Sequence, residues 1–187
     1  PFMTIKVAIN GFGRIGRCTL RAIYEQGLQN EFDVVAINAS GDLATNAHLL
    51  KYDTTHGRFT TSVETEGENC IIIDGKKIAF YSTKNPKDIN WADHGVDVLL
   101  ECTGAYTSKA KAQALLEQGA KRVLISAPGG DDVDTTIVMG VNEGALTAGM
   151  TVVSNASCTT NCLAPVAKVL SDAIGIKSGL MTTLHAY

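Results

Sequence analysis

The feature that most constrains the fold is a glycine-rich turn between a strand-like run and a helical pattern. Residues 5–10 have the β-branched and apolar composition of a strand, and they are followed at once by Gly11, Gly13 and Gly16. Residues 17–26 then carry apolar side chains at helical spacing, and a second β-rich run covers residues 33–38. These pieces predict a βαβ unit of about 30 residues with parallel strands.

The spacing of these glycines is typical of dinucleotide binding when it lies between a strand and a helix. Gly11 would make the tight turn, Gly13 would let a cofactor approach the backbone, and Gly16 would let the helix pack closely on the strand. A pyrophosphate would then sit at the N-terminus of the helix. A glycine-rich turn without any ligand is the alternative, and the complete strand–turn–helix–strand context disfavours it.

Further strand-like runs alternate with helical patterns along the rest of the chain. Strands are expected at residues 71–80 (a hairpin turning at Asp74-Gly75), 96–102, 121–126, 135–140 and 151–155, and helices at 44–52 and 108–118. This alternation predicts an α/β protein with a doubly wound parallel sheet, the Rossmann arrangement. Ligands bind such sheets at the carboxyl ends of the strands, where Thr103 and Gly104 could line a groove.

Composition excludes several other classes of protein. The 187 residues are 45% hydrophobic and 19% charged, as in a globular domain, and the net charge of −3 argues against nucleic acid or an anionic membrane surface as a partner. No apolar run reaches the roughly 18 residues of a membrane span. Five scattered cysteines suit a reducing compartment, and the first residues lack a signal-peptide layout. We therefore expect a cytoplasmic protein.

A second informative stretch covers residues 154–162, where a β-compatible run delivers Cys158 to the start of a helical pattern. A helix N-terminus stabilises a thiolate, which is the nucleophilic form of cysteine. His185 lies in a β-like run at residues 181–187 and could pair with that thiolate. The alternatives are an inert buried cysteine, or a metal or redox pair with Cys162; no further Cys/His cluster completes a metal site, so none is predicted.

The end of the second strand bears on the choice of cofactor. An acid there normally binds the adenosine 2′-hydroxyl and excludes a 2′-phosphate, but this strand ends Asn38-Ala39-Ser40-Gly41. Asp33 opens the strand at the wrong end, and Asp42 comes slightly late, although a loop could bring it back. The sequence therefore favours NADP or the use of both cofactors.

Taken together, five segments resemble glyceraldehyde-3-phosphate dehydrogenase, and the resemblance runs over essentially the whole chain. They are residues 10–17, 51–59, 126–128, 154–162 and 182–187. The resemblance implies reversible oxidative phosphorylation of glyceraldehyde 3-phosphate to 1,3-bisphosphoglycerate with NAD or NADP. Cys158 would be the nucleophile, His185 the base, and Ser157 and Thr159 would help to hold inorganic phosphate.

The resemblance also implies a set of cofactor contacts. Arg14 and Ile15 would contact the pyrophosphate and adenosine, and Asn38 the adenosine ribose. Ala39, where many NAD-preferring members have Asp, is similar to a NADP-tolerant bacterial branch that works in the gluconeogenic direction. The expected cofactor-binding residues are Gly11, Phe12, Gly13, Arg14, Ile15, Gly16, Asn38, Ala39, Lys84, Thr103, Gly104 and Ser126.

The expected organisation is a dinucleotide-binding domain over residues 1–157, followed by the first helix and strand of an α+β catalytic domain over residues 158–187. The rest of that domain is expected to be absent, so the chain alone should not turn over, although the complete protein would be a homotetramer. Erythrose-4-phosphate dehydrogenase is a related alternative, against which Ala186-Tyr187 argues. A non-catalytic cofactor-binding fragment and a Cys–His hydrolase remain as alternatives from other classes.

Overall fold

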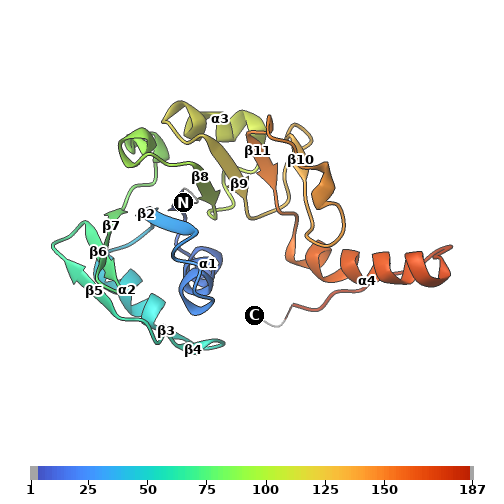
Figure 1. Cartoon of the computed structure of the whole chain (residues 1–187), viewed down its shortest axis with the longest axis horizontal. Helices are drawn as coiled ribbons and strands as arrows, with labels where there is room; N and C mark the ends of the chain where they lie inside the picture. The colour runs from blue at the N-terminus through green and yellow to red at the C-terminus, as the bar shows by residue number, and fades with distance from the viewer. Residues whose placement is uncertain (1–3, 186–187) are drawn as a thin grey trace.

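The predicted βαβ unit is present in the structure, a computed structural model that describes residues 4–185. It consists of β1 (Ile5–Asn10), α1 (Arg14–Glu25) and β2 (Phe32–Asn38), and the two strands pair in parallel. β1 is fully buried over its last four residues because it lies in the middle of a larger sheet, with β8 (Val98–Glu101) on its other side. Figure 1 shows this arrangement.

The described residues form a nine-stranded sheet in the order β10-β11-β9-β8-β1-β2-β7-β6-β5. The remaining strands are β5 (Val63–Glu66), β6 (Cys70–Ile73), β7 (Lys76–Tyr81), β9 (Arg122–Ile125), β10 (Thr135–Thr136) and β11 (Val152–Ser154). Only the β5–β6–β7 edge is antiparallel within this sheet, and β6 and β7 form the predicted hairpin. The chain leaves β1 toward β2 and later returns to β8, so the strand order reverses at β1. A ligand crevice is expected at such a switch point.

Helices cover the sheet on both faces. α2 (Leu43–Lys51) and α1 lie on one face, and α3 (Lys109–Glu117) and the 3₁₀ helices η1 (Pro86–Asp88) and η2 (Trp91–His94) lie on the other. Successive strand residues point to opposite faces, so Ile9 joins the hydrophobic cluster under α1 and Ala8 joins the cluster under α3. The chain also forms a third 3₁₀ helix, η3 (Glu143–Ala145), and a small separate hairpin of β3 (Tyr52–Asp53) and β4 (Gly57–Arg58).

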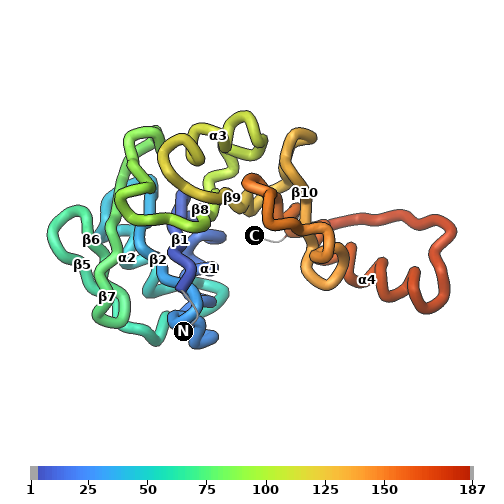
Figure 2. Tube along the Cα trace, turned by 45° about the horizontal axis from the view of Figure 1, so that its top comes forward, coloured from blue at the N-terminus to red at the C-terminus, as the bar shows by residue number. Residues whose placement is uncertain are grey.

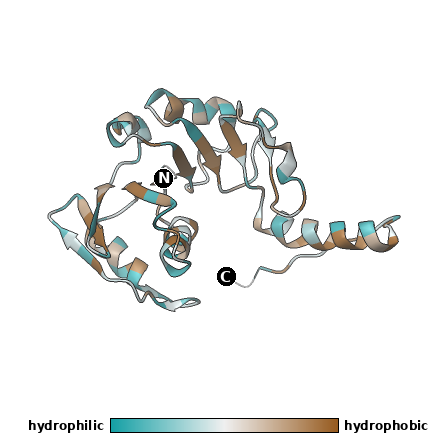
Figure 3. Cartoon of the chain, in the orientation of Figure 1, coloured by the Kyte–Doolittle hydropathy of each residue, from teal (hydrophilic) through white to brown (hydrophobic). Residues whose placement is uncertain are grey.

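The last helix, α4 (Cys158–Ile174), projects away from the sheet (Figures 1 and 2). It has 17 residues, and none of them is buried against the described part of the chain. Figure 3 shows that many residues along this helix are hydrophobic, and Val169 and Ile174 are 68% and 82% exposed. No helix among residues 4–185 combines the length and apolar character needed to cross a membrane.

Two of the expected strands differ from the structure. The expected strand at residues 135–140 ends at Thr136, because the side chain of Asn142 accepts a hydrogen bond from Val138 N and donates one to Thr136 O, which turns the chain. The prediction of a strand at residues 181–187 was wrong over residues 181–185, which form no strand. A strand needs a neighbouring edge with which to pair, and that segment lies beyond the projecting α4. Ala186 and Tyr187 lie outside the described residues.

Candidate functional site

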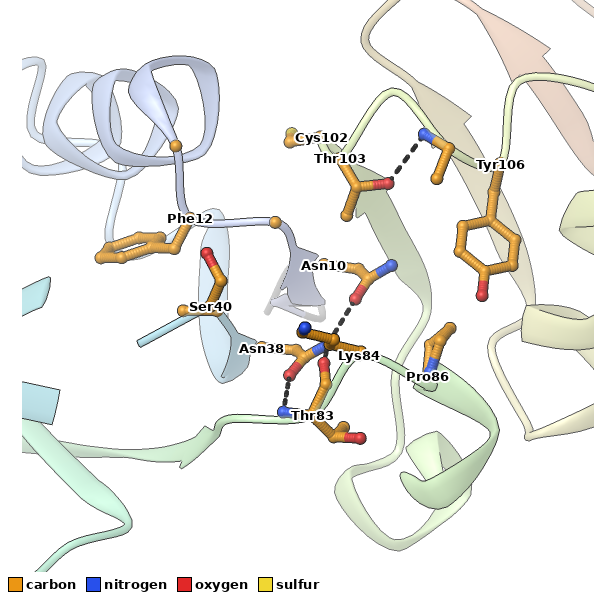
Figure 4. Close-up of a pocket in the computed structure, with 14 residues that line it drawn as sticks. Asn10, Phe12, Asn38, Ser40, Thr83, Lys84, Pro86, Cys102, Thr103 and Tyr106 are labelled. Atoms are coloured by element: carbon orange, nitrogen blue, oxygen red, sulfur yellow. Dashed lines mark hydrogen bonds between the residues drawn. The ribbon is translucent and has the colours of Figure 1, made fainter. Parts of the chain in front are cut away.

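A cavity of about 340 Å³ opens at the carboxyl ends of β1, β2 and β8, the crevice that the switch in strand order predicts. Figure 4 shows that its walls come from the turn after β1, the end of β2, the segment after β7 and the segment after β8. The structure brings together seven of the predicted cofactor residues around it: Gly11, Phe12, Gly13, Asn38, Ala39, Lys84 and Thr103.

The glycine positions fit a dinucleotide. Gly11 has φ of +99°, and a Cβ there would lie 2.7 Å from the backbone of Cys102 and Thr103. A Cβ on Gly16 would lie 2.2 Å from the Gly11 carbonyl oxygen, so α1 can pack on the turn only without one. By contrast, a Cβ on Gly13 would meet nothing within 4 Å, and this open position faces the cavity. Space is therefore left at the glycine where a cofactor would approach the backbone.

The N-terminus of α1 lies beside this cavity and retains free capacity for an anion. Its N-cap residue is Gly13, no side chain caps it, and its first turn contains no acidic residue. Helix N–H groups without intrahelical partners, together with the helix dipole, favour a phosphate at such a position. The residues present therefore fit the pyrophosphate of a dinucleotide.

Five predicted cofactor residues do not line the cavity. Gly16 lies inside α1, and Ile15 is 54% exposed on its surface. The Arg14 guanidinium forms an ion pair with Asp53 at 2.7 Å, which holds it toward the β3–β4 hairpin. The other two, Gly104 and Ser126, follow the ends of β8 and β9 without reaching the lining.

Neither of the two acids considered for the ribose reaches the tip of β2. Asp42 caps α2: one carboxylate oxygen accepts Thr45 N at 2.7 Å and the other accepts the Thr45 hydroxyl at 2.8 Å. Asp33 pairs with Lys76 at the opposite end of the strand. At the tip itself, Ala39 and Ser40 line the cavity, so this wall offers a methyl and a hydroxyl group in place of a carboxylate.

The sequence reasoning missed a buried carboxylate beneath the cavity. Glu101, at the end of β8, is 1% exposed, and burial raises the pKa of its carboxyl group, an effect opposed by hydrogen bonds from Thr103 and Asn10. The available signal was a charged residue inside the otherwise apolar run at residues 98–102. Asn10 was also missed as a lining residue; its amide donates to Glu101 and accepts from Asn38, and Figure 4 shows the contact with Asn38.

The turn into α4 is built around a buried serine. The Ser154 hydroxyl donates to Ala127 O at 2.6 Å and accepts the backbone N–H groups of Gly129 and Ala156, each at 3.0 Å. Ala156 then adopts φ of +59°, a left-handed conformation that costs a non-glycine residue about 1–2 kcal/mol. This turn sets the direction in which the chain enters α4.

Cys158 is the first residue of α4, as the sequence predicts, and it is exposed. Ser157 caps the helix by accepting Thr160 N at 2.9 Å, and the Thr159 hydroxyl lies 4.0 Å from the Cys158 sulfur. His185 instead contacts Thr183, with 3.3 Å between its Nε2 and the threonine hydroxyl. Within residues 4–185, no hydrogen bond joins His185 to Cys158, so the structure gathers Ser157, Cys158 and Thr159 but not the expected base.

Comparison with known proteins bears on both parts of the chain. A family model described as "Glyceraldehyde 3-phosphate dehydrogenase, NAD binding domain" matches residues 5–109, more than half of the chain and most of the cavity walls. The chain belongs to the glyceraldehyde 3-phosphate dehydrogenase family. The family model of the C-terminal domain matches residues 157–187, which include α4.

Individual glyceraldehyde-3-phosphate dehydrogenases of this family are similar over almost all of the chain. The plasmid-encoded one of Cupriavidus necator is 57% identical over 185 residues, which are 99% of this chain and 55% of that protein. The one of Cereibacter sphaeroides is 58% identical over 185 residues, and that of Pseudomonas aeruginosa is 55% identical. The chain therefore spans about half the length of the curated relatives it matches, and its cavity lies in an NAD-binding domain of this family.

Proposed function

We propose that this chain provides the cofactor-binding part of a phosphorylating glyceraldehyde-3-phosphate dehydrogenase. The single observation that carries the proposal is the cavity at the switch point, bordered by the uncapped N-terminus of α1 and by the open position at Gly13. A nucleotide diphosphate matches that combination of charge and space. Residues 1–157 would form the dinucleotide-binding domain, and residues 158–187 would begin the catalytic domain.

The proposed cofactor is NAD or NADP. The NAD-binding domain match supports NAD, while the absence of a carboxylate from the lining at the tip of β2 leaves room for a 2′-phosphate. A hydroxyl at Ser40 can donate to a phosphate, whereas an acid in its place would repel one. We therefore propose that both cofactors bind.

The proposed chemistry begins at Cys158. Its thiolate attacks the aldehyde carbon, and the resulting oxyanion takes a proton from the His185 imidazolium to give a thiohemiacetal. His185, now neutral, takes that hydroxyl proton back as hydride leaves the carbon. The nicotinamide ring, when bound, accepts the hydride. Inorganic phosphate, held by Ser157, Thr159 and the N–H groups at the start of α4, then attacks the thioester carbonyl, and Cys158 leaves as a thiolate with release of the acyl phosphate. The proton transfer to His185 requires this residue to lie within hydrogen-bonding reach of the adduct on Cys158. In the described structure His185 contacts Thr183 instead.

The catalytic arrangement would be completed by further chain packed against α4. The relatives continue for about as many residues again, and α4 has no buried residue here. We propose that the chain alone binds cofactor without turnover, and that the complete enzyme is a cytoplasmic homotetramer working in glycolysis or gluconeogenesis. A non-catalytic cofactor-binding role is the second candidate, and it is favoured because His185 contacts Thr183 and, within residues 4–185, makes no hydrogen bond to Cys158.

The test uses this chain and a fusion that continues it after His185 with the matching C-terminal part of the Cupriavidus necator plasmid enzyme. The chain should bind NADH, measured by nucleotide fluorescence, without reducing NAD in the presence of glyceraldehyde 3-phosphate and phosphate. The fusion should reduce NAD, and its Cys158→Ser variant should lose that activity while still binding NADH.

A Cys162→Ser variant of the fusion is the matched control, because its thiol lies one helical turn from Cys158. It should keep most of the activity. If the Cys158→Ser variant of the fusion remains active, Cys158 is excluded as the nucleophile. A chain that binds neither NADH nor NADPH would contradict the cofactor proposal itself. His185→Asn should slow hydride transfer, and an unchanged rate would exclude His185 as the base.

A further inference from the structure

A continuous series of side-chain hydrogen bonds joins three strands beneath the cavity. The sheet register places Asn10 of β1 opposite both Asn38 of β2 and Glu101 of β8. The Asn10 amide Nδ2 donates to Glu101 Oε2 at 2.6 Å, and Asn10 Oδ1 accepts from Asn38 Nδ2 at 2.8 Å. All three residues are buried, so these bonds form away from water, where an unmet polar group is costly.

Each end of the series reaches a wall of the cavity. At one end, Asn38 Oδ1 accepts Thr83 N at 3.1 Å and Asn38 Nδ2 also donates to Thr83 O at 3.1 Å, which fixes the segment that leads to Lys84. At the other end, Glu101 Oε1 accepts Thr103 N at 2.7 Å and also the Thr103 hydroxyl. Thr83 and Thr103 both line the cavity (Figure 4).

Every group directed at Glu101 is a donor. The Thr103 hydroxyl already accepts Ala105 N at 3.0 Å, which leaves its own proton for Glu101. An ionised carboxylate only accepts, whereas the two sides of an asparagine amide differ, one donating and one accepting. The carboxylate therefore allows only one orientation of Asn10, with Nδ2 toward Glu101. That orientation presents Oδ1 to Asn38 and fixes the second amide in turn.

We propose that Glu101 is a positioning residue for the cofactor cavity: its carboxylate orients the amides of Asn10 and Asn38 and thereby holds Thr83 and Thr103 on opposite walls. This inference rests on the proposed function for its link to NADH, although the orientation of the amides is a property of the chain alone. It also gives Asn38 a different role from the ribose contact expected from the family resemblance, because both ends of its amide are engaged within the protein.

A polarity exchange tests the proposal. In Glu101→Gln, the amide oxygen should stay toward Thr103, where it accepts two hydrogen bonds, and the amide NH₂ then faces Asn10 Nδ2, donor against donor. Flipping Asn10 relieves this contact, but it forces Asn38 to flip and breaks the bonds between Asn38 and Thr83. Adding Asn10→Asp restores the pattern: the introduced glutamine amide would donate to one oxygen of the introduced carboxylate, and the other oxygen would accept from Asn38 as before. Asn10→Asp alone places two carboxylates together and should be the most damaging of the three variants.

The first readout is hydrogen exchange at the backbone N–H groups of Thr83 and Thr103 in the chain without cofactor. The second is the Kd for NADH. We expect Glu101→Gln to speed Thr83 exchange and raise the Kd, each by about tenfold, the equivalent of one or two lost hydrogen bonds. The double variant should recover most of both effects.

Asp134→Asn is the matched control, since Asp134 is a carboxylate that accepts the N–H groups of Thr151 and Val152 away from the cavity. It should lower stability and leave Thr83 exchange and the Kd unchanged. The proposal is overturned if Glu101→Gln leaves Thr83 exchange at the wild-type rate. It is also overturned if the double variant restores neither the Thr83 exchange rate nor the Kd for NADH, and this includes the case in which both variants fail to fold. If the wild-type chain does not bind NADH, this result would count against the proposed function. The hydrogen-exchange measurement would still decide the role of Glu101.

Discussion

Ala39 lines the cavity at the point where we expect the choice between NAD and NADP to be made. It lies at the tip of β2, its backbone N–H donates to Tyr81 O at 3.0 Å, and its methyl group lines the cavity. In Ala39→Asp, a carboxylate at this fixed position would repel a 2′-phosphate and accept from a 2′-hydroxyl. We expect the ratio of the Kd for NADPH to that for NADH to rise by at least about tenfold, measured by fluorescence titration.

The control for this prediction is Asp42→Asn. Because Asp42 serves as the cap of α2, its substitution should lower stability without changing the ratio. An Ala39→Asp variant with the wild-type ratio would mean that the end of β2 does not select the cofactor.

Gly16 and Gly13 belong to the same glycine motif, but only Gly13 has room for a Cβ atom. In Gly16→Ala, the new Cβ would lie 2.2 Å from the Gly11 carbonyl oxygen, and this backbone overlap should cost more than the about 1 kcal/mol that alanine gains over glycine in a helix. We therefore expect Gly16→Ala to reduce the free energy of unfolding in urea. Gly13→Ala meets nothing within 4 Å and should leave that free energy nearly unchanged while weakening NADH binding. Equal stability of the two variants would contradict this account of the turn.

At the scale of elements, the β3–β4 hairpin is held against α1 by two arginines. Arg21 donates to Gly57 O at 3.0 Å and His56 O at 3.3 Å, and its guanidinium lies 5.2 Å from the centre of the Phe59 ring. Arg14 pairs with Asp53 at the start of the hairpin turn. The hairpin therefore depends on charged groups of α1 as well as on its own short ladder of backbone bonds.

This dependence predicts a response to acid. Hydrogen bonds from His56 N and Thr55 N, and the Arg14 guanidinium, lower the pKa of Asp53 to about 2. The folded pKa lies below the unfolded value of about 3.9, so the stability contributed by Asp53 is complete above about pH 4 and is lost as the pH falls toward about 2. Asp53→Asn should be less stable than the wild type at about pH 7, and the difference should shrink between about pH 4 and pH 2. A difference that is constant over this range in urea unfolding would argue against the ionised carboxylate.

The elements themselves were largely predictable, because each is encoded locally. The strand before the glycines, the hairpin at Asp74-Gly75 and the helix beginning at Cys158 all follow from periodicity and turn residues. The strand expected at residues 135–140 is shorter because Asn142 bends the chain through its side chain. Such a contact depends on a residue beyond the strand, so the apolar pattern alone could not reveal it.

At the scale of the whole molecule, the cavity is a product of strand order. β1, β2 and β8 are separated in sequence, and only their pairing places Asn10, Asn38 and Glu101 in one row. The glycine motif located the cavity from the sequence, the end of the strand at residues 96–102 pointed to Thr103, and the family resemblance supplied Lys84. The role of Glu101 could not be predicted, because it depends on the register of two strands and on the polarity of two amides.

α4 has a consequence for the reactivity of the cysteine that begins it. An isolated helix of this length is only marginally stable in water, and Pro165 removes one of its backbone hydrogen bonds. Without buried side chains to hold it, α4 should open and close locally at little free-energy cost. The dipole at its N-terminus exists only while the helix is formed, so the proposed role of Cys158 as nucleophile would be coupled to the ordering of α4. Alkylation of that thiol would then report how much of the helix is folded, and whatever packs on α4 would act as an activator of the cysteine.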